Sequence, residues 1–456
     1  MKRKSARNII LFTMVWLAFG FGYYRNLWGV AEKKRFDDFD VYCESQVIGR
    51  VIRSEKEGIF SEGGLNGWVR DDSVMKNMTW DEMTYFQFEI YKKGLKLGPA
   101  QFIIYDSQMG GQGMIDALLD KISPFSNTLN LFIFWLIDSF SFAFLLSVFV
   151  SWVNKNYGFN ASLITFLLLL ISPWLTFFGR DLYLVLASFY LPFIIMLMLL
   201  YYEFKEKTKI SLRKLFLLST GLVFLKLFFS GFEFITTALV MFTVPLFYYL
   251  FLSRWKLKFF FKRFTAVVFG AISATIIYAV LFSYQLSTLK GSFWYGFKYM
   301  LYCFLKRTHG NSADFPEGFK ASLETNVRVV LKYYFDSKAI DIGMVGISFR
   351  VLFFVLIIFS LLSMVSENIS PSTYINRKRN IALVFTTWVS ILAPLSWFII
   401  FQAHSYVHLG FDDIVWYMPY CLFGFALIGS VAPSLVKDIN AYFEIQDQGS
   451  AASDLK

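Results

Sequence analysis

The stretch from Ala161 to Phe204 reads ASLITFLLLLISPWLTFFGRDLYLVLASFYLPFIIMLMLLYYEF, and it indicates the class of fold. As one helix it would be about 66 Å long, more than twice the roughly 30 Å hydrocarbon core of a bilayer. Its only polar break is Gly179-Arg180-Asp181. We therefore predict that the chain turns back at this tripeptide and crosses a membrane at least twice within the stretch.

The composition agrees with a membrane protein. The 456 residues are 56% apolar and only 17% charged, with a mean hydropathy of +0.51, whereas soluble domains are about a quarter charged. This balance excludes a disordered chain, a fibrous protein and a disulfide scaffold. The net charge of +11 comes largely from short basic clusters between apolar runs, so we expect no nucleic-acid partner. The three cysteines, Cys43, Cys303 and Cys421, lack the spacing of a zinc site or disulfide framework.

Further apolar runs raise the expected number of crossings to about ten. The run from Leu215 to Leu252 is also too long for one span, and we expect it to turn at Ser230-Gly231. The remaining predicted spans are Ile9 to about Val30, Leu129 to Val153, Phe264 to Leu286, Val351 to Val365, Ile381 to Gln402, and Ile414 to about Val431. The predicted fold is an all-α polytopic membrane protein, with one transmembrane domain over residues 1–436 and a cytoplasmic tail over residues 437–456.

The basic residues predict the orientation. Alternate connections carry Lys155, then the clusters within 205–214, 254–263 and 377–379, which is the positive-inside pattern. Both termini are then cytoplasmic. Two long segments, 31–128 and 287–350, face outward, and all three histidines (His309, His404 and His408) lie on that side. We expect the functional site at this face.

The first outer segment opens with RFDDFDVYCESQVIGR at residues 35–50. Asp37, Asp38, Asp40 and Glu44 place four carboxylates close together. Apolar residues recur at helical spacing from Val41 to about Glu57, which predicts an amphipathic helix in the headgroup layer. The acidic cluster would lie at its N-terminus, where the helix dipole stabilises negative charge. The alternative is a solvated acidic turn that caps the helix and has no chemical role.

Two basic residues are candidate partners for these acids. Arg180 lies beside Asp181 in the predicted turn, and is either a phosphate ligand or an interfacial anchor. Lys226 lies about one helical turn before Ser230-Gly231, and Glu233 follows that turn. A charge at that depth needs a partner, so Lys226 either binds substrate or closes the turn by pairing with Glu233.

A second polar cluster, QAHSYVHLGFDD, spans residues 402–413. The spacing of His404 and His408 places both imidazoles on one face if the segment is helical. Two histidines and an aspartate could bind zinc. Phosphate binding, acceptor binding and a purely interfacial role are the alternatives, and Tyr406 lies between the two histidines.

Three other features remain open. The glycine-rich segment from Tyr105 to Gly113 lacks phosphate-loop spacing, so we interpret it as a tight loop near the acceptor. Asp138 lies within a predicted span and is either functional or hydrogen-bonded for helix packing. The segment from Lys298 to Lys338 resembles a second interfacial helical region that could hold anionic headgroups.

The order of these features resembles the GT-C glycosyltransferases. A cytoplasmic N-terminus, one span, an outer loop with Asp38-Phe39-Asp40 and an amphipathic helix occur in succession. The resemblance implies a sugar transfer from a polyprenyl-phosphate donor to an extracytoplasmic glycan, lipid or protein, with inversion at the anomeric carbon. It also implies that Asp38 or Asp40 is the catalytic base or binds a metal.

The remaining candidate residues then take binding roles. The substrate-binding set is Asp37, Glu44, Arg180, Asp181, Lys226, Glu233, His404, Tyr406 and His408. A divalent cation, Mg²⁺ or Mn²⁺, is the expected cofactor, with Asp40 and His404 as its ligands. Such a mechanism needs an acid and a cation on one face. We therefore expect Asp40, Arg180, Lys226 and His404 to line one outward-opening cavity.

Several segments also resemble uncharacterised bacterial inner-membrane proteins, namely those around Glu44-Ser-Gln, Tyr105-Asp-Ser-Gln and His404-Ser-Tyr-Val-His. This resemblance implies the bacterial inner membrane as the compartment and implies no reaction, whereas the expected multi-pass topology and extracytoplasmic active face follow from the apolar runs and the loop charges. A transporter or flippase of a lipid-linked saccharide is the alternative, although the internal repeats common in transporters are not visible. A non-catalytic scaffold would not need acids and cations gathered on one face.

Overall fold

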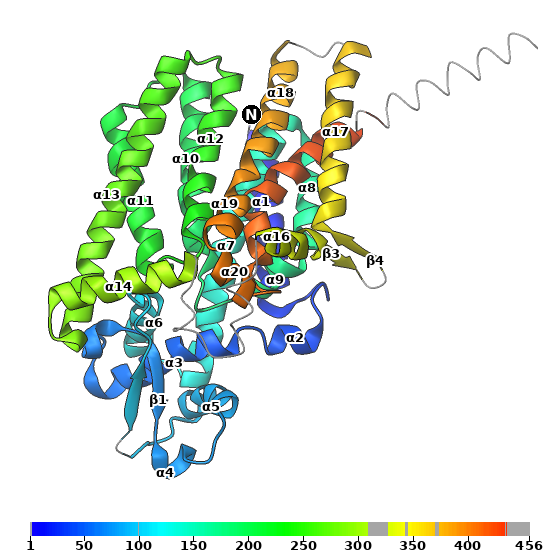
Figure 1. Ribbon diagram of the computed structural model, residues 1–456. Coiled ribbons are helices and arrows are strands. Elements are labelled where there is room, and N and C mark those ends of the chain that lie inside the picture. The colour runs from blue at the N-terminus through cyan, green and yellow to red at the C-terminus, as the bar shows by residue number, and fades with distance from the viewer. Residues whose placement is uncertain are drawn as a thin grey trace, which may run out of the picture.

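The computed structural model describes residues 2–98, 100–308, 327–342, 345–369, 374–433 and 435, and it is predominantly helical. A bundle of long helices forms most of the molecule (Figure 1). Its helices are α1 (Lys2–Arg25), α7 (Asn127–Tyr157), α8 (Phe159–Leu170), α9 (Pro173–Phe178), α10 (Leu186–Glu206), α11 (Leu212–Ser230), α12 (Ile235–Leu252), α13 (Leu257–Lys290), α17 (Phe349–Ile369), α18 (Tyr374–Ser390), α19 (Leu392–Ile400), and the helix Tyr420–Pro433.

Within the described residues, five helices are long and apolar enough to cross a membrane. They are α7, α10, α12, α13 and the continuous segment Asn376–Ile400 that contains α19. Three shorter apolar helices accompany them, Phe159–Leu170, Phe349–Val365 and Tyr420–Pro433. These helices agree with a multi-pass membrane protein. The number of ten crossings and the orientation remain predictions.

Both predicted turns are confirmed. Helix α11 ends at Ser230, and Gly231 follows with φ 50° and ψ −135°, a conformation that favours glycine. Helix α9 ends just before Gly179. The chain also breaks at Ser172, which the sequence analysis did not predict. There the Ser172 hydroxyl accepts a hydrogen bond from the Leu175 N–H, and Pro173 occupies the first turn of α9, so a new helix begins.

The connections between the helices fall into two groups, which lie at opposite ends of the bundle. The turns after α9 and α11 lie at the lower end in Figure 1, beside the segment 31–126. The N-terminus and the basic connections between α10 and α11 and between α12 and α13 lie at the opposite end. The structure therefore brings the two predicted outer segments to one end of the molecule.

The first of these segments folds into a small domain, here called the lobe (residues 33–122). Its elements are α2 (Lys33–Asp37), α3 (Val41–Glu57), η1 (Ser61–Gly64), β1 (Gly67–Arg70), α4 (Asp72–Met75), α5 (Trp80–Lys93), β2 (Gln101–Ile104) and α6 (Gly111–Ile122). Strands β1 and β2 pair antiparallel, with Gly67 opposite Ile104. A separate small core of Trp68, Met75, Met83 and Ile90 packs within the lobe. The all-α prediction omitted this short sheet.

Helix α3 has the predicted bounds but not the predicted surroundings. Val47, Ile48 and Val51 are buried, and the helix packs against α5, α6 and β1. A Cβ added to Gly49 would lie 2.0 Å from the Gly67 carbonyl oxygen, so only glycine allows this close approach of helix and strand. The apolar face of α3 is therefore covered by protein instead of lying in a headgroup layer.

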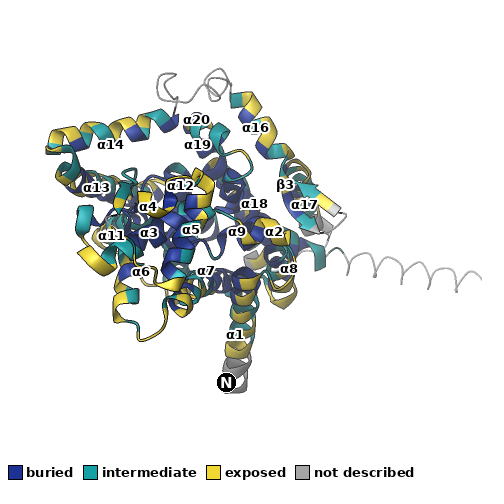
Figure 2. Cartoon of the chain, turned by 90° about the horizontal axis from the view of Figure 1, so that it is seen from below, coloured by how far each residue is buried: buried dark blue, intermediate teal, exposed yellow. Residues whose placement is uncertain are grey.

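The second predicted outer segment lies at the same end of the molecule as the lobe. It contains α14 (Phe293–Thr308), α16 (Val327–Asp336) and the antiparallel strands β3 (Lys338–Ile342) and β4 (Val345–Ser348), a second short sheet that the all-α prediction also omitted. Helix α20 (Gln402–Val407) and the 3₁₀ helix η4 (Asp412–Tyr417) lie beside them. Seen from the lobe end, α14, α20 and α16 follow one side of the molecule (Figure 2). His309, Lys320 and residues 437–456 lie outside the described residues.

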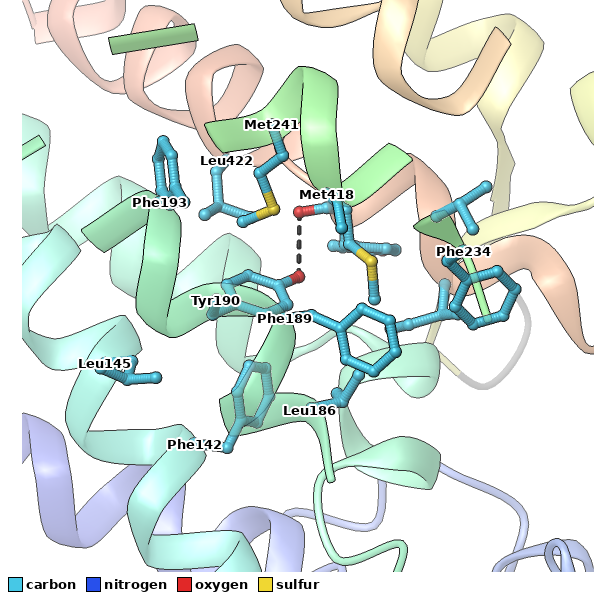
Figure 3. Packing of buried hydrophobic residues seen from close by; sticks show 14 of the residues in the cluster. Phe142, Leu145, Leu186, Phe189, Tyr190, Phe193, Phe234, Met241, Met418 and Leu422 are labelled. Atoms are coloured by element: carbon cyan, nitrogen blue, oxygen red, sulfur yellow. Dashed lines mark hydrogen bonds between the residues drawn. The ribbon is translucent and has the colours of Figure 1, made fainter. Parts of the chain in front are cut away.

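A continuous apolar core joins the bundle to η4. Phe142 of α7, Tyr190 and Phe193 of α10 and Met241 of α12 pack together there (Figure 3). The Tyr190 hydroxyl donates a 2.9 Å hydrogen bond to the Tyr417 carbonyl oxygen. This contact fixes the end of η4 on the bundle and thereby positions the polar residues at its start.

Candidate functional site

A cavity of about 300 Å³ lies at the lobe end of the bundle. Its walls come from α3, the loop after β2, the turn after α9, the turn after α11, α14 and α20. The lining residues are Tyr42, Cys43, Gln46, Tyr105, Ser107, Tyr183, Leu184, Glu233, Phe234, Lys306, Arg307, His404, Val407, His408, Phe411 and Asp412. We call this space the first cavity.

Glu233 is the central charge of the first cavity. One of its carboxylate oxygens lies 2.9 Å from Arg307 of α14, and the other lies 3.5 Å from Nε2 of His404. Burial alone would raise the pKa of Glu233, but Arg307 and His404 outweigh burial, so the pKa lies below its usual range. Glu233 is therefore an ionised carboxylate that holds a guanidinium and an imidazole in the wall.

The two predicted histidines lie together, as their spacing indicated. The rings of His404 and His408 are parallel within 1°, with centroids 4.1 Å apart. Asp412 of η4 joins them, with Oδ2 located 3.7 Å from Nδ1 of His404. The same oxygen accepts a 2.6 Å hydrogen bond from the Trp397 indole N–H.

The two imidazoles have opposite pKa shifts. Burial favours the neutral form of His404, but Glu233 and Asp412 outweigh burial and raise its pKa to about 9. Burial and the neighbouring His404 lower the pKa of His408 to about 4. Near neutral pH the site therefore contains one cationic and one neutral imidazole.

A cluster of buried carboxylates lies behind the wall of the first cavity. The Asp40 carboxyl group is hydrogen-bonded to Asp181 and to the thiol of Cys43, and Cys43 lines the cavity. Burial and the adjacent Asp181 raise the pKa of Asp40 well above its usual range. Asp40 and Asp181 therefore form a pair of neighbouring buried carboxyl groups, one side chain away from the cavity.

Glu44 extends the acidic cluster by one helical turn. Its Oε1 accepts hydrogen bonds from the Leu182 N–H at 3.0 Å and from the Trp135 indole at 3.1 Å. Burial and Asp181 raise the pKa of Glu44 to about 8, although Arg180 opposes the shift. Asp181 in turn accepts from two backbone N–H groups at 2.8 Å and thereby shapes the turn after α9.

The two predicted basic partners lie elsewhere. Arg180 stacks 4.0 Å from the Phe36 ring and donates to the Phe36 carbonyl oxygen at 2.9 Å. Lys226 donates to the carbonyl oxygens of Gly231 and Glu233, at 2.7 Å and 2.5 Å. Neither is among the residues that line the first cavity in the described structure. Arg180 holds α2 against the turn, and Lys226 closes the turn through backbone oxygens instead of the Glu233 carboxylate.

The remaining predicted residues occupy three environments. Asp37 and Asp38 are exposed, and Asp38 hydrogen-bonds to Tyr85 on the lobe. Tyr406 is half-buried and packs on the core, outside the lining of the first cavity. Asp40 is separated from the cavity by Cys43. Of the four residues expected to share one cavity, only His404 lines it.

Several site residues did not stand out as site candidates in the sequence. Arg307 was grouped with cations expected to hold lipid headgroups, yet it is the closest charged partner of Glu233. Tyr105 lies in the glycine-rich loop and receives a 3.0 Å hydrogen bond from the Tyr183 hydroxyl. Asp106, the next residue, is held by Lys290 at 2.8 Å and by Tyr299 at 2.8 Å. The glycine content of this loop was the sequence feature that could have indicated its role. A Cβ at Gly111 would collide with Phe228, so glycine allows the loop to pack closely against α11.

A second cavity of about 400 Å³ opens next to the first, lined in part by Arg35, Trp174, Phe177 and Asp413. The ring of Phe39 contacts a lining residue of each cavity. It stacks on Phe411 of the first cavity at 5.2 Å and on Phe177 of the second cavity at 4.9 Å.

Comparison of the chain with protein-family models, curated proteins and solved structures found no match.

Proposed function

We propose that the protein is an integral membrane glycosyltransferase that moves a sugar from a polyprenyl-phosphate donor to an acceptor on the outer face. The observation that supports this proposal is the first cavity. It combines the cations Lys306 and Arg307 with buried carboxyl groups, at the end of an apolar bundle. Sugar transfer from a lipid phosphate needs both kinds of group at one place.

In the proposed reaction, the acceptor hydroxyl oxygen forms a bond to the anomeric carbon, and the bond from that carbon to the phosphate oxygen breaks. The leaving group is the polyprenyl phosphate, whose negative charge would lie against Lys306 and Arg307. The acceptor proton passes to a carboxylate. Asp40 suits this role better than Asp38, because Asp38 faces Tyr85 on the exposed surface of the lobe.

The pairing of Asp40 with Asp181 fits a proton acceptor. Burial and the neighbouring Asp181 raise the pKa of Asp40, so its ionised form binds a proton more strongly than a solvent-exposed aspartate does. The acceptor hydroxyl would have to displace the Cys43 thiol to reach Asp40. We therefore expect Asp40 to become accessible when the donor fills the first cavity.

The test uses purified protein with a panel of polyprenyl-phosphate sugars and outer-face acceptors. We expect Asp40→Asn to lower turnover by about 10²-fold or more, the usual contribution of a general base. Asp38→Asn, its matched control two residues away, should retain turnover. Equal turnover in both variants would overturn the role of Asp40. Movement of the lipid carrier across vesicles without sugar transfer would favour a flippase.

A further inference from the structure

The residues at the start of the outer lobe do not fit the cation that the GT-C resemblance implies. Asp38 is exposed and hydrogen-bonded to Tyr85, whereas the Asp40 carboxyl group is buried against Asp181 and Cys43. A shared metal needs both carboxylates to converge on one point, and these two side chains have separate partners. The predicted pair of ligands, Asp40 and His404, is likewise divided by the cavity wall.

A different group in the first cavity does converge. His404, His408 and Asp412 each offer one ligand atom, and these atoms lie within 4.8 Å of one another. This spacing allows one ion at about 2.0–2.2 Å from each ligand after small side-chain rotations. All three residues line the first cavity.

Two buried ligand atoms in this group also lack hydrogen-bond partners. Within the described part of the chain, neither Nδ1 of His404 nor Oδ1 of Asp412 is hydrogen-bonded. The Asp412 side chain is fully buried, and that of His404 is 9% exposed. Unpaired polar atoms in such positions are costly and need an explanation. A bound cation would satisfy both.

The surrounding residues are those that support metal ligands. Glu233 lies 3.5 Å from Nε2 of His404, the ring nitrogen opposite Nδ1. Trp397 donates a hydrogen bond to Oδ2 of Asp412 and leaves Oδ1 available. A carboxylate behind a histidine and a donor behind a carboxylate orient these ligands in metal sites.

We propose that His404, His408 and Asp412 form a transition-metal site, with zinc as the preferred ion. Two imidazoles and one carboxylate favour zinc and its first-row neighbours, whereas Mg²⁺ and Ca²⁺ require mostly oxygen ligands. Three protein ligands leave one coordination position of a tetrahedral ion directed at the cavity. This site goes beyond the proposed function, since metal binding is measurable without any turnover.

The experiment measures zinc bound to the purified full-length chain, without a histidine tag, after dialysis against Zn²⁺ and excess Mg²⁺. We expect about one zinc ion per chain, and at least a tenfold loss of affinity in His408→Gln and in His404→Gln. Glu233→Gln should weaken binding by about 10–100-fold, as loss of a supporting carboxylate does elsewhere. Tyr406→Phe lies between the two histidines but outside the cavity lining, so it should bind zinc like the wild type.

Two results would overturn the metal site. The first is equal zinc content in the wild type and in the double variant His404→Gln/His408→Gln. The second is full displacement of zinc by millimolar Mg²⁺. If the variants do not fold, Co²⁺ added to the wild-type protein provides an independent readout. Visible absorption typical of four- or five-coordinate cobalt supports the site, and a spectrum like that of aqueous cobalt contradicts it. The two tests are independent. A protein that does not bind zinc can still be assayed for the effect of Asp40→Asn on sugar transfer, and a protein without transferase activity can still be assayed for zinc.

Discussion

Replacement of Glu44 by glutamine should change how the stability of the protein depends on pH. The glutamine Oε1 can accept the same hydrogen bonds from the Leu182 N–H and the Trp135 indole. The substitution therefore removes the titration with little change in packing. Burial and Asp181 raise the pKa of Glu44 to about 8, whereas an unfolded glutamate titrates near 4.3.

The direction of the pH dependence follows from the number of protons bound in the folded and unfolded states. Between about pH 4.3 and the folded-state pKa, the folded state keeps a proton that the unfolded state releases. The free energy of unfolding of the wild type therefore falls as the pH rises through this window, and levels off above it. The full difference in pKa corresponds to about 5 kcal/mol. We expect about half of that, because Asp181 and Arg180 readjust when Glu44 ionises.

The assay is thermal unfolding in detergent, followed by the fluorescence of the 12 tryptophans, at several values between pH 5 and pH 9. Glu44→Gln should match the wild type near pH 5 and unfold at a higher temperature near pH 9. Glu57→Gln lies on the same helix but is 44% exposed and ion-paired with Arg53, so it should shift stability by less than about 1 kcal/mol. A wild-type advantage over Glu44→Gln that grows with pH would refute the reasoning.

The remaining predictions concern the ion pair and the helix–strand contact. Arg307→Gln or Glu233→Gln alone should lower the free energy of unfolding by about 3–5 kcal/mol, because each leaves a buried charge without its partner. The double variant should be less destabilised than the two single losses added together, and additive losses in thermal unfolding would show that the pair is not coupled. Gly49→Ala places a Cβ against the Gly67 carbonyl oxygen and should destabilise the lobe by about 1–3 kcal/mol. Gly221→Ala in α11, where a Cβ would meet nothing within 4 Å, is the matched control, and equal melting temperatures for the two alanine variants would contradict the close approach.

The local features of the fold were predictable from the sequence. The turns at Gly179 and Ser230, the bounds of α3 and the shared face of His404 and His408 all follow from helix geometry and from polar breaks in apolar runs. Each depends on residues close together in the chain. Such patterns are set by periodicity and by the cost of breaking a helix, which a single sequence displays.

The partners of the charged residues were not predictable. Lys226 and Arg180 were expected in a shared cavity. Instead, Lys226 donates to a carbonyl oxygen of the turn that follows α11, and Arg180 donates to the Phe36 carbonyl oxygen of α2. Glu233 instead pairs with Arg307, which reaches it from a distant helix. The pairing of cations with acids depends on how α11, α14 and α20 pack against one another. A single sequence does not show directly how these helices pack.

The ring of Phe39 links the packing of the two cavities at this end of the bundle. It stacks on Phe411, which lines the space of about 300 Å³, and on Phe177, which lines the space of about 400 Å³. Phe39→Ala would remove a side chain that packs on both of these rings. A substitution next to Asp40 would therefore loosen the linings of both cavities at once.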